Sequence, residues 1–208
     1  IVPLNEILKN AEENNYGVGC YNAINLDMIR GVLNAAEKEN SPVILCHAEV
    51  HFKYTSLEQI APIMVREAER AEVPVALLFD HGEDFDSIVK AMKLGFNAVM
   101  YDGSNLDYEE NLRNTKEIVK IARAKNVDVE AELGHVTRPE GAGAEGKEAD
   151  DLVNDTSLYT YPRQAKQFVD ETGIDALAVA FGTAHGVYLK EPELDIKRLQ
   201  KIYDYVDV

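Results

Sequence analysis

The chain alternates short apolar runs with longer segments in which apolar residues recur every three or four positions. Runs of strand length begin near residues 17, 42, 74, 97, 127 and 176, and a segment of helical period lies between each pair. Runs that are apolar throughout are typical of strands buried on both faces, as in parallel sheets. Strict alternation of such strands with helices therefore predicts a parallel α/β architecture.

Several helix boundaries carry signals of their own. Asp84 can cap a helix, and Ser56 with Gln59 three residues later forms a capping-box pattern. Gly95 suits the left-handed position that ends a helix. In the helix after Ser56, Pro62 predicts a kink or a later start, because proline cannot donate the helical hydrogen bond.

Polar residues stand at the carboxyl end of nearly every predicted strand. They are Asn22, His47, Asp80, His81, Asp102, Glu132 and His185. In a barrel, active sites are built at that end from many strands, whereas an open doubly wound sheet uses only the few strand ends near its switch point. The pattern therefore favours a (β/α)8 TIM barrel, with about the first six units present in this chain.

The stretch Val73–Gly82 is the strongest single indication of a site. It reads as a buried strand that ends in Asp80 and His81, an acid and an imidazole side by side. His81 and His185 end the third and sixth strands, and Glu132 ends the fifth, so the set suits zinc or a similar divalent ion. Each of these residues alone could instead be a hydrogen-bonded structural residue. The predicted strands contain no lysine, so a Schiff-base mechanism there lacks its nucleophile.

Composition narrows the class of protein. The chain has 37 acidic and 21 basic residues and a formal net charge of −16, so nucleic acid and anionic membranes would repel it. Cys20 and Cys46 both lie in apolar runs, which predicts buried reduced thiols and a cytoplasmic protein. The sequence shows neither an apolar run of transmembrane length nor a signal peptide.

Five blocks of the sequence resemble the class II ketose-bisphosphate aldolases, the zinc-dependent family that cleaves fructose or tagatose 1,6-bisphosphate. The blocks are Asp80-His-Gly, Val99-Met-Tyr-Asp-Gly-Ser104, Val129-Glu-Ala-Glu-Leu-Gly134, Leu158-Tyr-Thr160 and Ala178-Val-Ala-Phe-Gly-Thr-Ala-His-Gly-Val-Tyr188. The resemblance implies reversible aldol cleavage to dihydroxyacetone phosphate and an aldehyde such as glyceraldehyde 3-phosphate. It also implies one catalytic Zn²⁺ per chain and a homo-oligomer, a dimer or a tetramer.

The resemblance also implies roles for individual residues. Asp80 is the general acid/base at the C4 hydroxyl, and His81 and His185 are zinc ligands. Gly186 contributes backbone to dihydroxyacetone-phosphate binding. The chemistry agrees, because cleavage leaves an enediolate whose developing charge a divalent cation stabilises.

Four further residues receive roles, two at the metal and two in substrate binding. Glu132 is a secondary zinc ligand or a partner of one, and a purely structural role stays open. Asp102 orients a zinc histidine through its ring N–H, and a turn-forming role stays open as well. Asn22 and Ser104 are assigned to substrate binding.

The loop after the fifth strand departs from the family pattern. The family's mobile loop carries a Gly-Gly-x-Glu-Asp motif, whose Glu moves the proton on the dihydroxyacetone-phosphate carbon. Here Gly141–Asp150 is longer and altered. Counting back from Leu158 places Glu148 on that Glu, with Glu145 as the alternative.

The second strand and the end of the chain depart as well. Ala48 lies near the position where the family commonly has a substrate-binding hydroxyl. His47 and His51 could suggest a second metal site, but we favour an ordinary polar loop there. The family's third zinc histidine and its phosphate motifs follow strands seven and eight, which these residues do not contain. We therefore expect one TIM-barrel domain over 1–208 without units seven and eight, and a seventh strand starting at Val206–Val208.

Three functions fit these observations. The first is a metal-dependent fructose- or tagatose-bisphosphate aldolase that acts on a small phosphorylated ketose. The second is a non-catalytic relative that binds sugar phosphates. The third is a class II aldolase for a different ketose phosphate, which the change at Ala48 allows. Fructose and tagatose differ only in configuration at C4, and no residue in the sequence distinguishes them.

Overall fold

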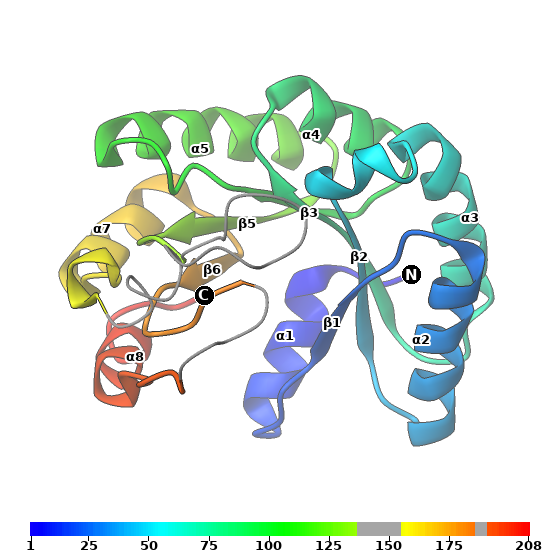
Figure 1. The fold of residues 1–208 in the computed structure, drawn as a ribbon, viewed down its shortest axis with the longest axis horizontal. Coiled ribbons are helices and arrows are strands. Elements are labelled where there is room, and N and C mark those ends of the chain that lie inside the picture. The colour runs from blue at the N-terminus through cyan, green and yellow to red at the C-terminus, as the bar shows by residue number, and fades with distance from the viewer. Residues whose placement is uncertain (137–154, 186–190) are drawn as a thin grey trace. The chain divides into compact units, whose positions relative to one another are not determined.

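Six strands form one sheet whose order follows the chain from β1 to β6 (Figure 1). The computed structural model describes residues 1–136, 155–185 and 191–208. The strands are β1 (Gly19–Asn22), β2 (Val43–Ala48), β3 (Val75–Gly82), β4 (Ala98–Tyr101), β5 (Asp128–Leu133) and β6 (Ala176–Val179). Each lies within a run that the hydrophobic pattern predicted.

Helices alternate with these strands. The α-helices are α1 (Leu4–Glu13), α2 (Leu26–Glu39), α3 (Leu57–Arg70), α4 (Phe85–Lys93), α5 (Tyr108–Arg123), α7 (Pro162–Thr172) and α8 (Ile196–Tyr203). Two short 3-10 helices, η1 (Glu49–Lys53) and η2 (Thr156–Leu158), were not predicted. Both are too short to show helical periodicity, so the pattern gave no signal for them.

The strand order decides between the two predicted architectures. Strands β1 to β4 pair in parallel with their sequence neighbours. A doubly wound sheet reverses its strand order at a switch point, and this sheet does not reverse. Six parallel strands with alternating helices are consistent with part of a (β/α) barrel, in agreement with the fold class read from the sequence.

The chain divides into two compact units. The first comprises residues 1–102, 117–130 and 174–176, and the second comprises 103–116, 131–173 and 177–208. The polar residues that end β1, β3 and β4 therefore belong to the first unit. Glu132 and His185 belong to the second.

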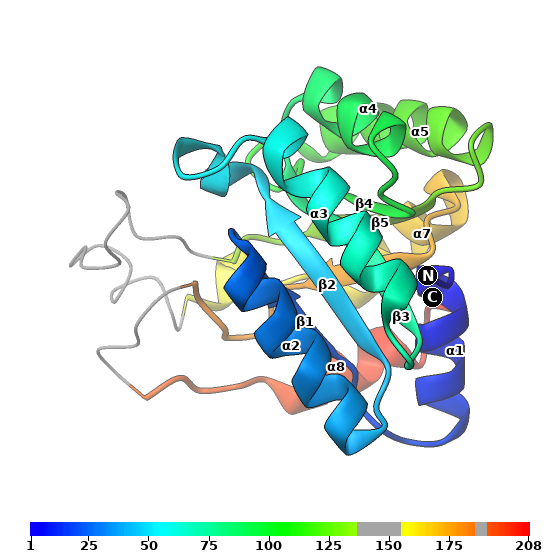
Figure 2. The same ribbon diagram turned by 90° about the vertical axis from the view of Figure 1, so that its right-hand side faces the viewer.

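Strand β2 shows why the apolar runs are continuous. All six of its residues are buried. Helix α2 packs on β2 and on α3, and α3 packs in turn on β3 (Figure 2). A parallel strand covered on both faces requires an apolar residue at nearly every position.

Local capping signals set the helix boundaries as predicted. Asp84 accepts a hydrogen bond from the Ser87 backbone N–H at 2.9 Å, and the capping box at Ser56 is present. Gly95 has a φ of 102°, in the left-handed region. The later start expected from Pro62 is wrong, because α3 begins at Leu57 and runs through the proline. A proline there removes only one helical hydrogen bond, which this capped helix tolerates.

Two smaller expectations fail. The segment Val206–Val208 is not a strand, and the Val206 N–H instead bonds the Ile202 carbonyl at 3.1 Å, continuing the turn after α8. Cys46 is buried as predicted, but Cys20 is exposed. The Cys20 thiol donates to the Cys46 sulfur at 3.4 Å, and this contact, together with burial, raises the pKa of Cys46.

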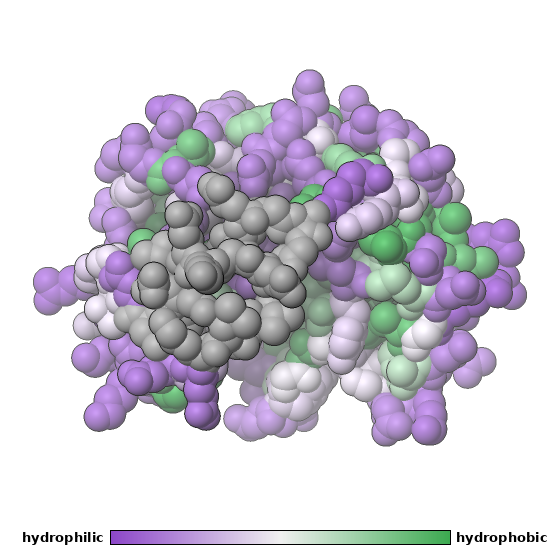
Figure 3. Space-filling view, viewed as in Figure 1, coloured by the Kyte–Doolittle hydropathy of each residue, from purple (hydrophilic) through white to green (hydrophobic). Residues whose placement is uncertain are grey.

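The surface over α5 is polar. In the view of Figure 3 the residues over α5 are mostly hydrophilic. Across the described ranges, no helix has both the length and the apolar character needed to cross a membrane.

The part-buried side chain of Asn97 bridges two backbone segments of the first unit. Its side chain accepts from the Leu77 N–H at 2.8 Å and donates to the Val2 carbonyl at 2.6 Å. Replacing it by alanine leaves two backbone groups without these partners, so Asn97→Ala should lower the free energy of unfolding by about 1–3 kcal/mol. Urea unfolding measures the change. Asn34→Ala on the exposed face of α2 is the control, and equal stability of the two variants would contradict a role for the bridge.

Candidate active site

The carboxyl end of β3 is irregular where Asp80 and His81 lie. The register between β3 and β4 shifts between Phe79 and Gly82, and His81 has a φ of 47°. Successive residues of a regular strand point to opposite faces, and a bulge re-aims a side chain. Here the nearest polar atoms of the two side chains, His81 Nε2 and Asp80 Oδ1, are 3.9 Å apart.

Neighbouring contacts hold this strained backbone. A left-handed conformation costs an L-residue roughly 1–2 kcal/mol, and such strain is often found at functional sites. The Asp102 N–H donates to the Gly82 carbonyl at 2.9 Å, directly after His81. Gly82 itself lies so close to its surroundings that an added Cβ would approach Ile88 Cγ1 to 2.6 Å. The end of β3 is therefore fixed from β4 and from α4.

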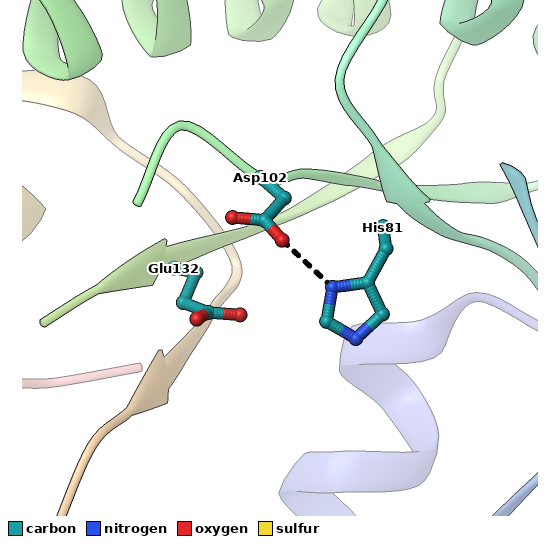
Figure 4. Close-up of side chains that lie close together, drawn as sticks. All are labelled: His81, Asp102 and Glu132. Atoms are coloured by element: carbon teal, nitrogen blue, oxygen red, sulfur yellow. Dashed lines mark hydrogen bonds and ion pairs between the residues drawn. The ribbon is translucent and has the colours of Figure 1, made fainter. Parts of the chain in front are cut away.

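Asp102 also holds the imidazole of His81. His81 Nδ1 donates to Asp102 Oδ2 at 2.8 Å, and none of the Asp102 side chain is exposed (Figure 4). Such a bond fixes the ring orientation and places the proton on Nδ1, so Nε2 is the nitrogen that a metal would bind. This contact is the one that the orienting role predicted for Asp102 requires. The role itself stays a prediction.

Asn22, at the end of β1, contacts Asp80 directly. Its Nδ2 donates to Asp80 Oδ2 at 2.8 Å. Its Oδ1 is buried and accepts no hydrogen bond from the described residues. The sequence assigned Asn22 to substrate, and the structure shows that its amide nitrogen is already used to position Asp80.

In the second unit, a buried polar network holds the main chain at Glu132. Asn111 on α5 donates from Nδ2 to the Glu132 carbonyl at 2.9 Å, and Thr115 donates to Asn111 Oδ1 at 3.1 Å. The three residues are all buried. Sequence reasoning missed Asn111 and Thr115, although their spacing of four residues places them on one helix face and could have drawn attention to them.

A second buried hydroxyl joins the ends of β5 and β6. Thr160 Oγ1 donates to the Leu133 carbonyl and accepts from the Ala180 N–H. It thus takes the place of a ladder hydrogen bond beyond the regular strands. The sequence placed Thr160 in a family motif without giving it a role. His185 follows β6 and is partly buried.

His81 and Asp102 form a hydrogen-bonded pair in the first unit, and Glu132 belongs to the second unit; all three are labelled in Figure 4. One imidazole with two carboxylates suits zinc and similar divalent ions. Asp102 already accepts from His81 Nδ1, so it fits an orienting role better than a ligand role. The assignments of Glu132 and His185 as zinc ligands stay predictions.

The remaining predicted residues divide into two sets. Ser104 lies in the turn between β4 and α5, and its substrate role stays a prediction. Glu148, its alternative Glu145, and Gly186 lie outside the described residues.

Comparisons with known proteins identify the family. The family model of class-II fructose-bisphosphate aldolase matches residues 2–208. The chain belongs to this family. The fructose-bisphosphate aldolase of Staphylococcus aureus is 40% identical over 205 residues, which cover 97% of this chain and 68% of the relative. That of Thermus caldophilus is 42% identical over 199 residues, covering 95% of this chain and 63% of the relative.

Solved structures agree with the family assignment. The YdjI aldolase from Escherichia coli K12 has a TM-score of 0.85 and 34% identity, covering 100% of this chain and 70% of that one. A putative fructose-1,6-biphosphate aldolase from Coccidioides immitis has a TM-score of 0.84 and 30% identity, covering 97% and 69%. The names of these relatives support an aldolase, a lyase of carbohydrate metabolism. The family assignment therefore does not favour a non-catalytic relative that only binds sugar phosphates.

Removing Asp102 should weaken metal binding. Without its carboxylate the His81 ring loses its fixed orientation, so Asp102→Ala should lower zinc affinity about 10–100-fold. Competition with a chromogenic chelator measures the affinity. Asp86→Ala, which removes an exposed carboxylate on α4, should bind zinc as the unmodified protein does. A folded Asp102→Ala variant with unchanged affinity would rule out the orienting role.

Proposed function

We propose that this protein catalyses the metal-dependent aldol cleavage and condensation of a ketose 1,6-bisphosphate, fructose or tagatose. The products of cleavage are dihydroxyacetone phosphate and glyceraldehyde 3-phosphate. The observation that carries the proposal is the arrangement at the end of β3, where Asp80 and His81 lie together, Asn22 holds Asp80, and Asp102 holds His81. Membership of the class-II aldolase family supports the reaction type.

Asp80 has the position and surroundings of a proton-transfer group. In cleavage it takes the proton of the C4 hydroxyl, and in condensation it returns that proton. Asn22 holds Oδ2 of the carboxylate, so Oδ1 is the oxygen offered to the substrate. A carboxylate fixed in this way loses little orientational freedom when it meets the substrate.

The proposed metal ligands are His81, His185 and Glu132. A zinc ion held by them would supply positive charge beside the enediolate oxygens that form when the carbon–carbon bond breaks. The donor types and the Asp102–His81 hydrogen bond support this assignment.

The remaining roles rest on the family resemblance. Glu148 moves the proton on the dihydroxyacetone-phosphate carbon, and Gly186 and Ser104 contact the substrate. Because the chain carries a net charge of −16, a bisphosphate approaches against the global field. Local backbone N–H groups and the metal have to oppose that repulsion. A homo-oligomer, dimer or tetramer, and a cytoplasmic location are part of the same proposal.

A non-catalytic relative is disfavoured by the retained Asp80–His81–Asp102 arrangement, because a binding module does not need a positioned acid/base group. The alternative that remains is a class II aldolase that acts on a different ketose phosphate. Ala48 is buried and lies opposite Asp80 in the β2–β3 register. We infer that the Ala48 methyl group takes the place of the hydroxyl with which the family contacts substrate.

The decisive experiment measures metal content and cleavage on the protein in its full natural length. About one zinc per chain is expected, and a chelator should abolish cleavage of fructose 1,6-bisphosphate, which readdition of zinc should restore. Zinc without cleavage of either bisphosphate would point to another ketose phosphate. Cleavage that survives complete zinc removal would contradict the metal-dependent mechanism.

Asp80→Ala separates proton transfer from metal binding. Because the variant lacks the acid/base group but keeps His81, kcat should fall about 10²–10⁴-fold while zinc content stays unchanged. Steady-state kinetics and metal analysis check both. Asp86→Ala, an exposed aspartate nearby in sequence, should keep full turnover. Near-native turnover by Asp80→Ala would show that the assigned role is wrong.

A further inference from the structure

His47 connects the loops that follow β1 and β2. It is the second-last residue of β2 and is fully buried. Its Nδ1 lies 2.9 Å from the Ala23 carbonyl oxygen, and its Nε2 lies 3.3 Å from that of Thr55. Both ring nitrogens therefore face carbonyl oxygens, which excludes His47 as a metal ligand in this arrangement. Its position instead fixes the Ala23–Ile24 peptide, which comes shortly after Asn22.

Thr55 strengthens the same connection. Its hydroxyl donates to the Ile24 carbonyl at 2.8 Å. The Ala23 N–H donates to the Cys46 carbonyl at 2.9 Å. The three consecutive peptides between Asn22 and Asn25 are thus held by β2 and by Thr55, which follows η1.

Glu49 connects η1 to the other side of the candidate site. Its Oε2 accepts from the Glu83 N–H at 2.8 Å and from the Asp84 N–H at 3.4 Å. These two N–H groups directly follow Asp80-His81-Gly82 and precede the first turn of α4, where a carboxylate is favoured. The side chains of Glu83 and Asp84 are also acidic, so Coulomb repulsion would drive Glu49 away without these bonds.

Aromatic stacking packs η1 against β3. The Phe52 ring stacks between His47, with centroids 6.0 Å apart, and Phe79, with centroids 5.9 Å apart. Phe79 is the residue before Asp80. The segment is therefore attached to β3 on both sides of the Asp80–His81 pair, by Phe52 before it and by Glu49 after it.

These contacts matter because the Asn22–Asp80 hydrogen bond spans β2. Strand β2 lies between β1 and β3 in the sheet, and at the level of Asp80 it offers only the methyl group of Ala48. No polar side chain of β2 stands there to fix the separation of Asn22 and Asp80. The segment His47–Thr55, which we call the brace, holds the peptides that follow both residues.

We propose that Glu49 is a positioning residue of the aldolase, which acts through the brace to keep Asp80 in place. It holds the turn after Asp80-His81 by its two backbone hydrogen bonds, so that Asp80 stays aligned with Asn22. This inference rests on the proposed function, since it assigns Asp80 as the proton-transfer group. A misplacement of about 1 Å in such a group lowers turnover by about 10²-fold and leaves much of substrate binding intact.

The test compares three variants of the full-length holoenzyme. Glu49→Ala removes both hydrogen bonds, Glu49→Gln keeps a carbonyl acceptor without the charge, and Glu69→Ala removes an exposed carboxylate from α3 as the matched control. We expect kcat of Glu49→Ala to fall about 10–100-fold, with KM changed less than about threefold. Glu49→Gln should recover most of kcat, and Glu69→Ala should resemble the unmodified enzyme.

Two further readouts separate positioning from general destabilisation. Zinc content should be unchanged in Glu49→Ala, and amide hydrogen exchange should accelerate at Glu83 and Asp84. If Glu49→Ala does not fold, Glu49→Asp replaces it, because the shorter side chain should show the same changes to a smaller degree.

Other outcomes overturn the inference. Unchanged kcat in Glu49→Ala removes the positioning role, and a raised KM with normal kcat makes Glu49 a substrate contact instead. Equal losses in Glu49→Ala and Glu49→Gln, with normal exchange at Glu83, would show that charge acts rather than position. If the unmodified protein does not cleave the bisphosphate, the proposed function fails, and exchange at Glu83 and Asp84 still decides whether the brace exists.

Discussion

The hydrogen bond between His81 Nδ1 and Asp102 Oδ2 joins two residues that would each be energetically unfavourable without the other. Asp102 is a carboxylate with no exposed side-chain surface, and a buried charge without a partner is strongly unfavourable. His81 has a left-handed backbone at φ 47°, which alone would tend to relax. The bond satisfies the carboxylate and holds the strained histidine, so the end of β3 and the end of β4 depend on each other.

The other polar contacts of the first unit extend this arrangement. Asn22 reaches Asp80 from β1, and Glu49 holds the turn behind it from η1. Strands β2 and β4 are buried along their whole length, so the sheet supplies a rigid support while hydrogen bonds fix the side chains. This division explains why β2 can end in Ala48 and still influence the site, because its following segment acts through the backbone.

In the second unit the same principle appears with different residues. Asn111 holds the Glu132 carbonyl, and Thr160 bridges the Leu133 carbonyl to the Ala180 N–H. Both are buried side chains that replace strand-to-strand hydrogen bonds where the strands end. Buried polar groups of this kind stabilise only when every member is satisfied, which ties the chain path at the end of β5 closely to these two residues.

The sequence by itself determined the succession of strands and helices, the caps at Ser56 and Asp84, and the polar residues at the strand ends. These features follow from periodicity and from contacts within three or four residues, which is why they could be predicted. The prediction of a strand at Val206–Val208 and the prediction that Cys20 is buried were both wrong. Only the tertiary structure decided that His81 takes a left-handed conformation beside a register shift, and that Glu49, Asn111 and Thr160 bind main-chain groups at Glu83, Glu132 and Leu133. Their contacts join residues 34, 21 and 27 positions apart, and local sequence carries no record of which distant backbone group a polar side chain meets.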